Sequence, residues 1–588
     1  MEKYLVKFLV WRIKHLSDKN FVLILSGLIG IVVGSAAVGL KTTVHLIQHK
    51  LTSGFTIGYA NYLYFGYPLV GILITVVMAR MLREKLGHGI TNILYAISKK
   101  SSMISPSKMF SRMLTSTATV SLGGSVGLEA PAVVTGAAIG ANIGKVTHLG
   151  QKKRTILISC GSAAAISAIF NSPVAGVIFC LEVILAEVTI ATFIPLLIAS
   201  VFASLVSLTL LGDDVLFSFK LRDSFQAIDT PFYIILGMLC GLVSVYFARV
   251  THKVESLLVR IKQRLPRALV GGVILGLIIF VFPPIYGEGY YTIKLLLAGE
   301  GNKILNNSLF FSNIHDLGFL LLFLTGVILV KPIASALTIG AGGNGGIFAP
   351  SLFLGGLTGY TFASLTDSFV ANAMSPSNFT LVGMCGVMSG VLHAPLTAIF
   401  LIAEITGGYE LFIPLMLVSA IALSTSSFFE KYSLYTKHLI ESGDLIQYDK
   451  DKQVLSLIDL KKVVEKDLLT IHPNASLEDM VDLVRASKRN IFPVVNEKEE
   501  LLGIVTLDDI RNIMFDEEDR PTIPISSLMH SPPAHVTSHE NMQSVMRKFE
   551  VTGAWNLPVI DDGKYVGFLS KSRIFNTYRT KLIRQNKE

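Results

Sequence analysis

The sequence predicts an all-α polytopic membrane domain, built of two repeated halves with discontinuous helices, followed by a cytosolic α/β tandem domain. Three observations support this fold class. The composition is unusually apolar and poor in charge. Two glycine-rich motifs recur at nearly one offset within broken apolar stretches. Beyond Ile440 the chain becomes polar and carries two similar segments of soluble character.

The composition places the chain among membrane proteins. Hydrophobic residues make up 51% and charged residues 16% of its 588 positions, whereas soluble domains carry roughly 25% charge. The mean hydropathy is +0.57. These values argue against a soluble enzyme, a disordered chain and a small disulfide scaffold. The four cysteines lie in apolar stretches without a CxxC pair, so we interpret them as buried hydrophobic residues and predict no metal site.

Charge is distributed unevenly along the chain. Residues 1–440 carry a net charge of +13 and residues 441–588 carry −4. Basic residues dispersed between apolar runs fit cytoplasmic loops better than a nucleic-acid surface, so no nucleic-acid partner is expected. Residues 1–20 interleave lysines with Leu, Val, Phe and Trp, which predicts an amphipathic helix along the cytoplasmic membrane face. No signal peptide or organelle signal is evident, which favours a bacterial inner membrane with both termini cytoplasmic.

The apolar runs between residues 21 and 440 predict a transmembrane domain. Phe21–Leu40 contains no charged residue and is long enough to cross a bilayer. Other runs are short, or are interrupted by glycine and proline as in IGAGGNGGIFAP. Such segments are typical of half-helices that end inside a membrane. Their ends must line a polar cavity, because lipid cannot satisfy free backbone groups.

An internal repeat indicates a duplicated membrane half. Gly127–Pro131 (GLEAP) and Gly346–Pro350 (GIFAP) share a pattern, with a glycine at the first position and Ala-Pro at the end. We therefore expect halves of about 21–225 and 226–440. The repeat alone leaves open whether they are parallel or inverted.

A second pair of motifs supports the duplication. Pro173 precedes Glu182 by nine residues, and Pro395 precedes Glu404 by nine, so this pair recurs at nearly the same offset as the glycine motifs. We expect both acids to be structural, each bonding to backbone or polar groups within its own half.

Glu129 is the leading candidate for a functional residue. It is a lone carboxylate among glycines and small apolar residues, and an acid at membrane depth is costly. Free amides at a helix start favour an anion, so Glu129 could take the anion's place when charged and leave it when protonated. An acid in a surface loop is the alternative. The glycines before Ile347 and Phe348 predict a second helix start whose amides face an ion. The alternative is a tight turn or close helix packing.

The last part of the chain predicts two related soluble modules. Residues 441–463 are polar and predict a linker. Pro558 repeats Pro493, and Gly567 repeats Gly503 at almost the same offset, each within a helix–strand–turn–strand–helix pattern. We expect the modules at 464–520 and 521–588.

Together these motifs resemble the CLC family of chloride channels and proton/chloride antiporters, with a C-terminal pair of CBS domains. The resemblance implies a homodimer in a lipid bilayer, with one chloride pore per subunit and two inverted halves. By match to the family's motifs it implies that Glu129 is the gating glutamate. It also implies that Ile347 and Phe348 supply amides to the anion, and that Tyr435 in SLYTKHL supplies a hydroxyl.

One element departs from the family pattern. The usual Gly-Ser-Gly-Ile-Pro is here Gly87-His88-Gly89-Ile90-Thr91. An imidazole N–H can donate to an anion. We therefore expect His88 and Gly89 to face the inner anion site, the alternative being a histidine packed at a helix end. Thr91 replaces a proline that the family associates with anion preference, so the preference for chloride over nitrate stays open.

A second departure concerns proton coupling. Where the family's antiporters usually carry an internal proton-transfer glutamate, this chain has Val183, which cannot bind a proton. Its loss favours channel-like conduction. Coupled H+/Cl− exchange is the alternative, because Glu187 or water could carry the proton. Arg112 precedes Glu129 at the place where the family often has a lysine, and could instead be an ordinary cytoplasmic-side arginine.

The CBS resemblance implies an adenine nucleotide, ATP, ADP or AMP. The first module keeps the family signature, with Thr506 for phosphate and Asp509 for ribose. The second has Arg573 in place of the acid, so we expect at most one formed site. A purely structural dimerisation module is the alternative.

Three other classes of protein fit this sequence less well. A cation transporter with CBS modules needs several pore acids or carbonyl rings. A membrane enzyme would show a motif such as HExxH, a serine elbow or a Walker loop. A scaffold protein would not need a carboxylate among glycines.

Overall fold

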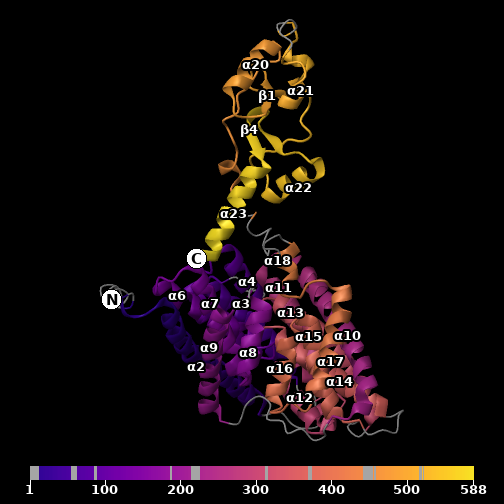
Figure 1. The fold of residues 1–588 in the computed structure, drawn as a ribbon. Coiled ribbons are helices and arrows are strands. Elements are labelled where there is room, and N and C mark those ends of the chain that lie inside the picture. The colour runs from indigo at the N-terminus through magenta and orange to yellow at the C-terminus, as the bar shows by residue number, and fades with distance from the viewer. Residues whose placement is uncertain are drawn as a thin grey trace. The chain divides into compact units, whose positions relative to one another are not determined.

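The structure is a computed structural model, and it describes residues 12, 14–53, 62–84, 89–185, 189–212, 225–306, 308–310, 316–367, 374–441, 455, 458–515, 520 and 522–587. The chain forms two compact units, Met1–Leu445 and Ile446–Glu588 (Figure 1). Most of the helix expected over residues 1–20 lies outside the described residues. Its described end leads into a longer helix that begins at Asp18, where the Ser17 hydroxyl accepts from the Asn20 amide at 3.3 Å.

The first unit is helical throughout its described part. Within that part, eight helices are long and apolar enough to cross a membrane. They are α2 (Asp18–Thr52), α3 (Leu63–Met81), α7 (Gln151–Phe170), α9 (Ile190–Leu211), α10 (Thr230–Val259, extended from Ala227), α11 (Arg264–Val281), α13 (Leu317–Gly340) and α17 (Phe412–Phe429).

The other helices of this unit are mostly shorter, as the broken apolar runs predict. They are α4 (Gly89–Lys99), α5 (Ser111–Ser121), α6 (Glu129–Val146), α8 (Pro173–Phe179), α12 (Tyr290–Leu297), α14 (Phe348–Asp367), α15 (Pro376–Leu392), α16 (Pro395–Ile405) and α18 (Lys437–Glu441). Short η turns join several of them: η1 (Pro106–Met109), η2 (Cys180–Ile184, a π-helical turn), η3 (Ala227–Asp229), η4 (Pro283–Ile285) and η5 (Gly301–Leu305).

Glycines let equivalent helix pairs of the two halves pack closely. A Cβ on Gly136 of α6 would lie 2.1 Å from the carbonyl oxygen of Gly161 on α7. A Cβ on Gly355 of α14 would lie 2.3 Å from that of Gly383 on α15. The two glycine pairs are related along the chain by the same offsets as the two repeated motifs. The duplication therefore extends to packing, where only glycine allows backbones this close.

The acids of the second repeat join the two halves. Glu404 of α16 accepts from the amides of Val174 and Ala175 at the start of α8, at 3.0 and 2.9 Å. Glu182 of η2 accepts from the amides of Leu396 and Thr397 at the start of α16, at 3.0 and 2.8 Å. The short helices α8 and α16 lie side by side (Figure 1).

The expectation that each acid bonds within its own half is therefore wrong. Proline at the first position of a helix leaves neighbouring amides without intrahelical acceptors, and a carboxylate satisfies two at once. Because α8 and α16 pack against each other, the carboxylate within reach of each helix start belongs to the other half.

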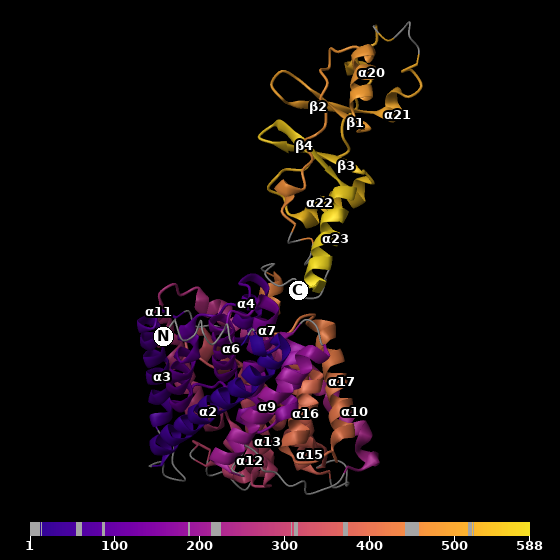
Figure 2. The same ribbon diagram turned by 60° about the vertical axis from the view of Figure 1, so that its left-hand side comes forward.

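The second unit contains two similar modules (Figure 2). The first has α20 (Leu477–Ala486), β1 (Ile491–Val495), β2 (Leu501–Thr506) and α21 (Leu507–Ile510). The second has α22 (Met542–Thr552), β3 (Asn556–Asp561), β4 (Lys564–Ser570) and α23 (Lys571–Lys587). Two short turns, η7 (Leu460–Lys462) and η8 (Ile525–Ser527), lie outside these elements.

Each module has a two-stranded antiparallel hairpin with one bulge, after Val494 and after Val559. A single parallel bridge adds Ile471 beside Val494, and Val536 beside Val559. The repeat of the two modules is thus confirmed at the level of strand register.

We predict that Glu404→Ala destabilises the first unit, because two helix-start amides lose their acceptor. Buried groups left without a partner cost about 1–3 kcal/mol each, so the midpoint of thermal unfolding in detergent should fall. Glu404→Gln keeps one acceptor oxygen and should cost less. The exposed Glu410 supplies the control, and an equal loss in Glu410→Ala would contradict the capping role.

Candidate functional site

The two glycine-rich motifs meet at the centre of the first unit. The amide of Gly127 donates to the carbonyl of Gly346, and the amide of Gly346 donates back to Gly127, both at 2.9 Å. This reciprocal pair brings the starts of α6 and α14 together. The first amides of a helix have no intrahelical acceptor and carry partial positive charge. The meeting point of two such starts therefore favours an anion.

The carboxylate of Glu129 lies at this meeting point. Glu129 is the first residue of α6 and is 1% exposed. Its side chain folds back over Gly127, since a Cβ there would lie 1.9 Å from Oε2. The amide of Ala349 on α14 faces the carboxylate. Oε2 has no hydrogen-bond partner among the described residues, whereas Oε1 accepts a hydrogen bond from the hydroxyl of Tyr290.

The start of α14 is buried in an aromatic environment. Ile347 is 1% exposed and Phe348, the first residue of α14, is fully buried. The ring of Phe348 lies 5.4 Å from that of Phe170 and 6.4 Å from that of Phe179. This packing excludes water from around the helix start, which strengthens electrostatic interactions there.

Tyr435 and the start of α4 belong to the same region. Tyr435 lies between α17 and α18, and its buried hydroxyl has no partner among the described residues. Its carbonyl accepts from the hydroxyl of Thr91 at 3.0 Å. A Cβ on Gly89 would lie 2.8 Å from Val134 of α6. The structure thus brings Gly89 and Tyr435 toward the helix that carries Glu129, while His88 lies outside the described residues.

Val183 is 9% exposed and belongs to η2, next to Glu182. Glu187, the alternative proton carrier, lies outside the described residues.

Three charged or polar residues beside Glu129 escaped the sequence analysis. They are Glu288, Tyr290 and Lys331, all less than 9% exposed. Glu288 and Lys331 carried the same signal as Glu129, since each is a charge within an apolar or glycine-flanked stretch. Tyr290 gave no such signal, because a tyrosine is common in apolar sequence.

Arg112 of α5 anchors the glycine loop before α14. This fully buried guanidinium donates to the side-chain oxygen of Asn344 at 3.2 Å. The Asn344 side chain donates in return to the carbonyl of Arg112 at 2.9 Å and to the hydroxyl of Thr115 at 2.7 Å. These bonds fix the loop that presents Ile347 and place a cation behind it.

In the second unit, Thr506 and Asp509 bond to each other. The amide and hydroxyl of Thr506 both donate to Oδ2 of Asp509, each at 2.7 Å. His530 lies 3.2 Å from the same oxygen. Partial burial acts to raise the pKa of Asp509, but the bonds from Thr506 and the nearby His530 outweigh it and hold the pKa below its usual value. Asp509 is therefore a ready acceptor at neutral pH.

The corresponding position of the second module is already occupied. The hydroxyl of Ser570 donates to Glu465 at 2.7 Å, and the other oxygen of Glu465 pairs with Arg489 at 2.7 Å. The amide of Arg573 donates to Ser570 at 3.2 Å. A carboxylate thus accepts from the hydroxyl in both modules, and what distinguishes the second module is Arg573 at the position of Asp509.

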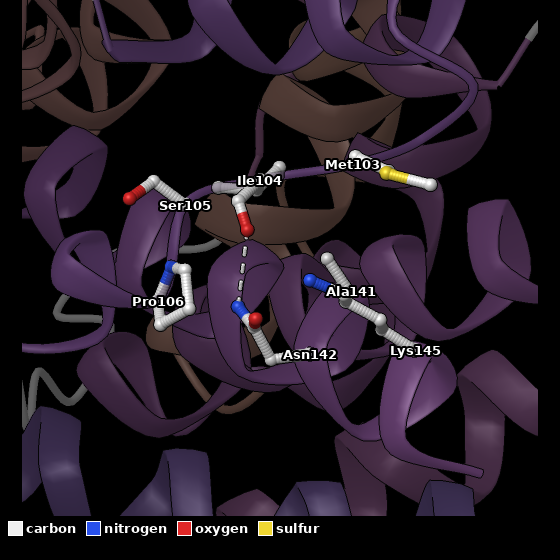
Figure 3. Close-up of a pocket in the computed structure, with 7 residues that line it drawn as sticks. All are labelled: Met103, Ile104, Ser105, Pro106, Ala141, Asn142 and Lys145. Atoms are coloured by element: carbon white, nitrogen blue, oxygen red, sulfur yellow. Dashed lines mark hydrogen bonds between the residues drawn. The ribbon is translucent and has the colours of Figure 1, made fainter. Parts of the chain in front are cut away.

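A small cavity of 170 Å³ lies at the far end of α6. Figure 3 shows Asn142 at its edge, donating to the carbonyl of Ile104 at 3.2 Å, with Lys145 beside it. Lys145 follows Glu129 by sixteen residues along the helix, or about 24 Å. The cavity is therefore separate from the Glu129 site.

The family model for the voltage-gated chloride channel matches residues 69–427. The CBS domain model matches residues 460–516 and 525–579. The first unit thus belongs to the voltage-gated chloride channel family, the CLC family, and the chain is a multi-pass membrane protein with two C-terminal CBS domains.

Curated proteins with similar sequences are named as chloride channels. The chain is 26% identical to chloride channel protein CLC-f of Arabidopsis thaliana, over 70% of this chain and 58% of that protein. It thus spans less than two thirds of that relative. It is 29% identical to the voltage-gated ClC-type chloride channel ClcB of Escherichia coli, over 56% of this chain and 74% of that protein.

Solved structures show the same fold. A slow cyanobacterial Cl−/H+ antiporter matches with a TM-score of 0.61 and 22% identity, covering 73% of this chain and 98% of that one. A eukaryotic CLC transporter matches with a TM-score of 0.60 and 18% identity, covering 95% of this chain and 99% of that one.

We predict that Gly127→Ala displaces the Glu129 carboxylate, because the new methyl group would occupy its place. A Cβ at this position would also lie 2.7 Å from Cβ of Ala349, so the thermal midpoint should fall as well. Gly39→Ala is the control, since its Cβ would meet nothing within 4 Å. Density maps of both variants check this, and an unmoved carboxylate in Gly127→Ala would contradict it.

Proposed function

We propose that the protein transports anions, chloride first among them, through a pore in which Glu129 is the gating residue. The observation that carries this proposal is the carboxylate of Glu129 at the meeting point of two helix starts. That place suits an anion, so the carboxylate and a chloride ion compete for it. Protonation removes the charge of the carboxylate, and the site then becomes free for chloride.

Five other residues would complete the anion path. The amides of Ile347 and Phe348 lie at the start of α14, and the buried hydroxyl of Tyr435 can donate to an ion. Gly89 allows close approach at the start of α4. His88 stays a predicted donor, and its substitution by alanine should change anion selectivity or pH dependence.

Channel-like conduction is the form of transport we favour. Valine at position 183 offers no group to carry a proton inward from Glu129. The alternative is H+/Cl− exchange, with a proton carried by Glu187 or by water. Both forms require Glu129, and they differ in whether proton and chloride flows are coupled.

The assembly and placement we propose follow the family. The protein is a homodimer in a bacterial inner membrane, with the N-terminal segment 1–20 and the CBS unit cytoplasmic. The transport domain covers 21–440 and the linker 441–463, with CBS modules at 464–520 and 521–588. The family assigns a transport role rather than an enzymatic one.

The zero-current potential of the full chain in a planar bilayer distinguishes channel conduction from H+/Cl− exchange. The chloride gradient is held fixed while a pH gradient is imposed. A potential that stays at the chloride equilibrium value is the result expected for a channel, because Val183 carries no proton. A potential that moves with the pH gradient would contradict channel conduction and establish exchange.

Glu129→Gln should raise chloride flux severalfold at neutral pH and remove its dependence on pH. The neutral side chain cannot compete as a charge for the helix starts. Chloride efflux from vesicles between pH 5 and pH 8 measures this. Glu410→Gln, at an exposed acid, is the control. Unchanged flux in Glu129→Gln would contradict the gating role.

We also propose one adenine-nucleotide site, at Thr506 and Asp509 of the first module. Thr506→Val should weaken binding of ATP, ADP or AMP about tenfold, the usual effect of one lost hydrogen bond to a charged group. Ser570→Ala should leave binding unchanged, because the second module has Arg573 in place of the acid that would contact ribose. Calorimetry on the full chain in detergent tests both, and absence of heat with every nucleotide would contradict the site.

A further inference from the structure

A tight turn at residues 285–290, the clamp turn, packs against the Glu129 site. Gly287 and Gly289 have φ angles of +64° and +89°, in the left-handed region that favours glycine. A Cβ on Gly289 would lie 2.4 Å from the ring of Phe353 on α14. These glycines let the turn lie close to both helix starts, so that Glu288 and Tyr290 both reach the Glu129 segment.

Tyr290 bonds directly to the gating carboxylate. Its hydroxyl donates to Oε1 of Glu129, and the side chain is 4% exposed. The ring of Phe170 packs edge-on against Tyr290 at 6.5 Å. Packing fixes the ring, so the hydroxyl has little freedom to leave the carboxylate. A hydrogen bond to the charged form of an acid stabilises that form.

Glu288, also in the clamp turn, contacts the same segment. Its Oε1 accepts from the amide of Leu128, the residue before Glu129, at 3.1 Å. Both carboxylates are buried, and they lie close enough for their charges to interact. Two like charges in a dry site repel each other. When Glu288 is itself charged, it therefore opposes the charged form of Glu129, which Tyr290 favours.

Lys331 of α13 ties the clamp turn to the glycine loop. Its ammonium group donates to the hydroxyl of Ser125 at 2.8 Å and to the carbonyls of Ile285 and Gly287, each at 3.5 Å. It also lies 4.7 Å above the ring of Phe353. Its positive charge acts on Glu288 and limits the repulsion between the two acids.

We propose that the clamp turn sets the position of the gate, with Tyr290 as a positioning residue that holds the Glu129 carboxylate over the helix starts and Glu288 as the charge that opposes it. The proposal rests on the gating role proposed for Glu129. The two residues then have opposite effects on the pH at which flux rises, which a merely structural turn would not produce. The titratable and charged groups around Glu129 are Tyr290, Glu288, Tyr435, Lys331 and, acting on Glu288, Lys41.

Tyr290→Phe removes the hydroxyl and keeps the ring. Because the charged carboxylate loses its donor, protonation should displace it more easily. We expect the pH midpoint of chloride flux in vesicles to rise by about one unit, a tenfold change. Tyr246→Phe is the matched control. The Tyr246 hydroxyl of α10 donates to the carbonyl of Leu329 at 2.6 Å, outside the clamp turn.

Glu288→Gln removes a charge and keeps an oxygen that can accept from Leu128. With less repulsion, the Glu129 carboxylate should hold its place to lower pH. We expect the midpoint to fall, opposite in sign to Tyr290→Phe. Midpoints that move in the same direction, or that stay within the range of Tyr246→Phe, would overturn the proposal.

The two proposals fail in different ways. In a Glu129→Gln background neither Tyr290→Phe nor Glu288→Gln should alter flux or its pH profile, and an effect there would overturn the clamp while leaving the gate intact. If Glu129→Gln itself leaves flux and pH dependence unchanged, the gating role is wrong. A density map of Tyr290→Phe shows whether the carboxylate has moved, and an unmoved carboxylate with an unshifted midpoint would contradict the clamp.

Discussion

The structure depends on the burial of one carboxylate at the meeting point of two helix starts. The reciprocal hydrogen bonds between Gly127 and Gly346 hold the starts of α6 and α14 together, and their free amides make a region of positive potential inside the first unit. An acid is costly in such a dry place. Glu129 is tolerated because the amide of Ala349 faces its carboxylate and the Tyr290 hydroxyl donates to it.

The two halves of the unit are joined by more than this one contact. Glu182 and Glu404 each satisfy amides at a helix start of the other half. The equivalent pairs α6–α7 and α14–α15 pack through glycines at the same repeat offsets. The duplicated sequence thus gives equivalent helix contacts in the two halves. The candidate site at Glu129 lies where the two halves meet. An asymmetry follows from the sequence, since Phe348 stands where the first half has Glu129.

Much of the fold and part of the site could be predicted from residues alone. Apolar runs broken by glycine and proline predicted short helices. The glycine motifs predicted Glu129 and the Ile347–Phe348 helix start as candidates, and the resemblance to the CLC family implied that they serve one anion path. The exact partners of Glu182 and Glu404 could not be predicted, because both acids were expected to bond within their own half. Glu288 and Lys331 were visible as isolated charges, yet no pattern in the sequence connects either of them with Glu129.

The sequence by itself determined the class of protein, the duplication and the position of the carboxylate proposed as the gate, because composition, spacing and local helix-start chemistry are written along the chain. Only the tertiary structure decided which charges share the buried site. Tyr290, Glu288 and Lys331 are all distant from Glu129 along the chain, and they lie in the second half of the duplication. Their contacts arise where the clamp turn and α13 pack onto the glycine loops, and long-range packing of this kind leaves no periodic signal in the sequence.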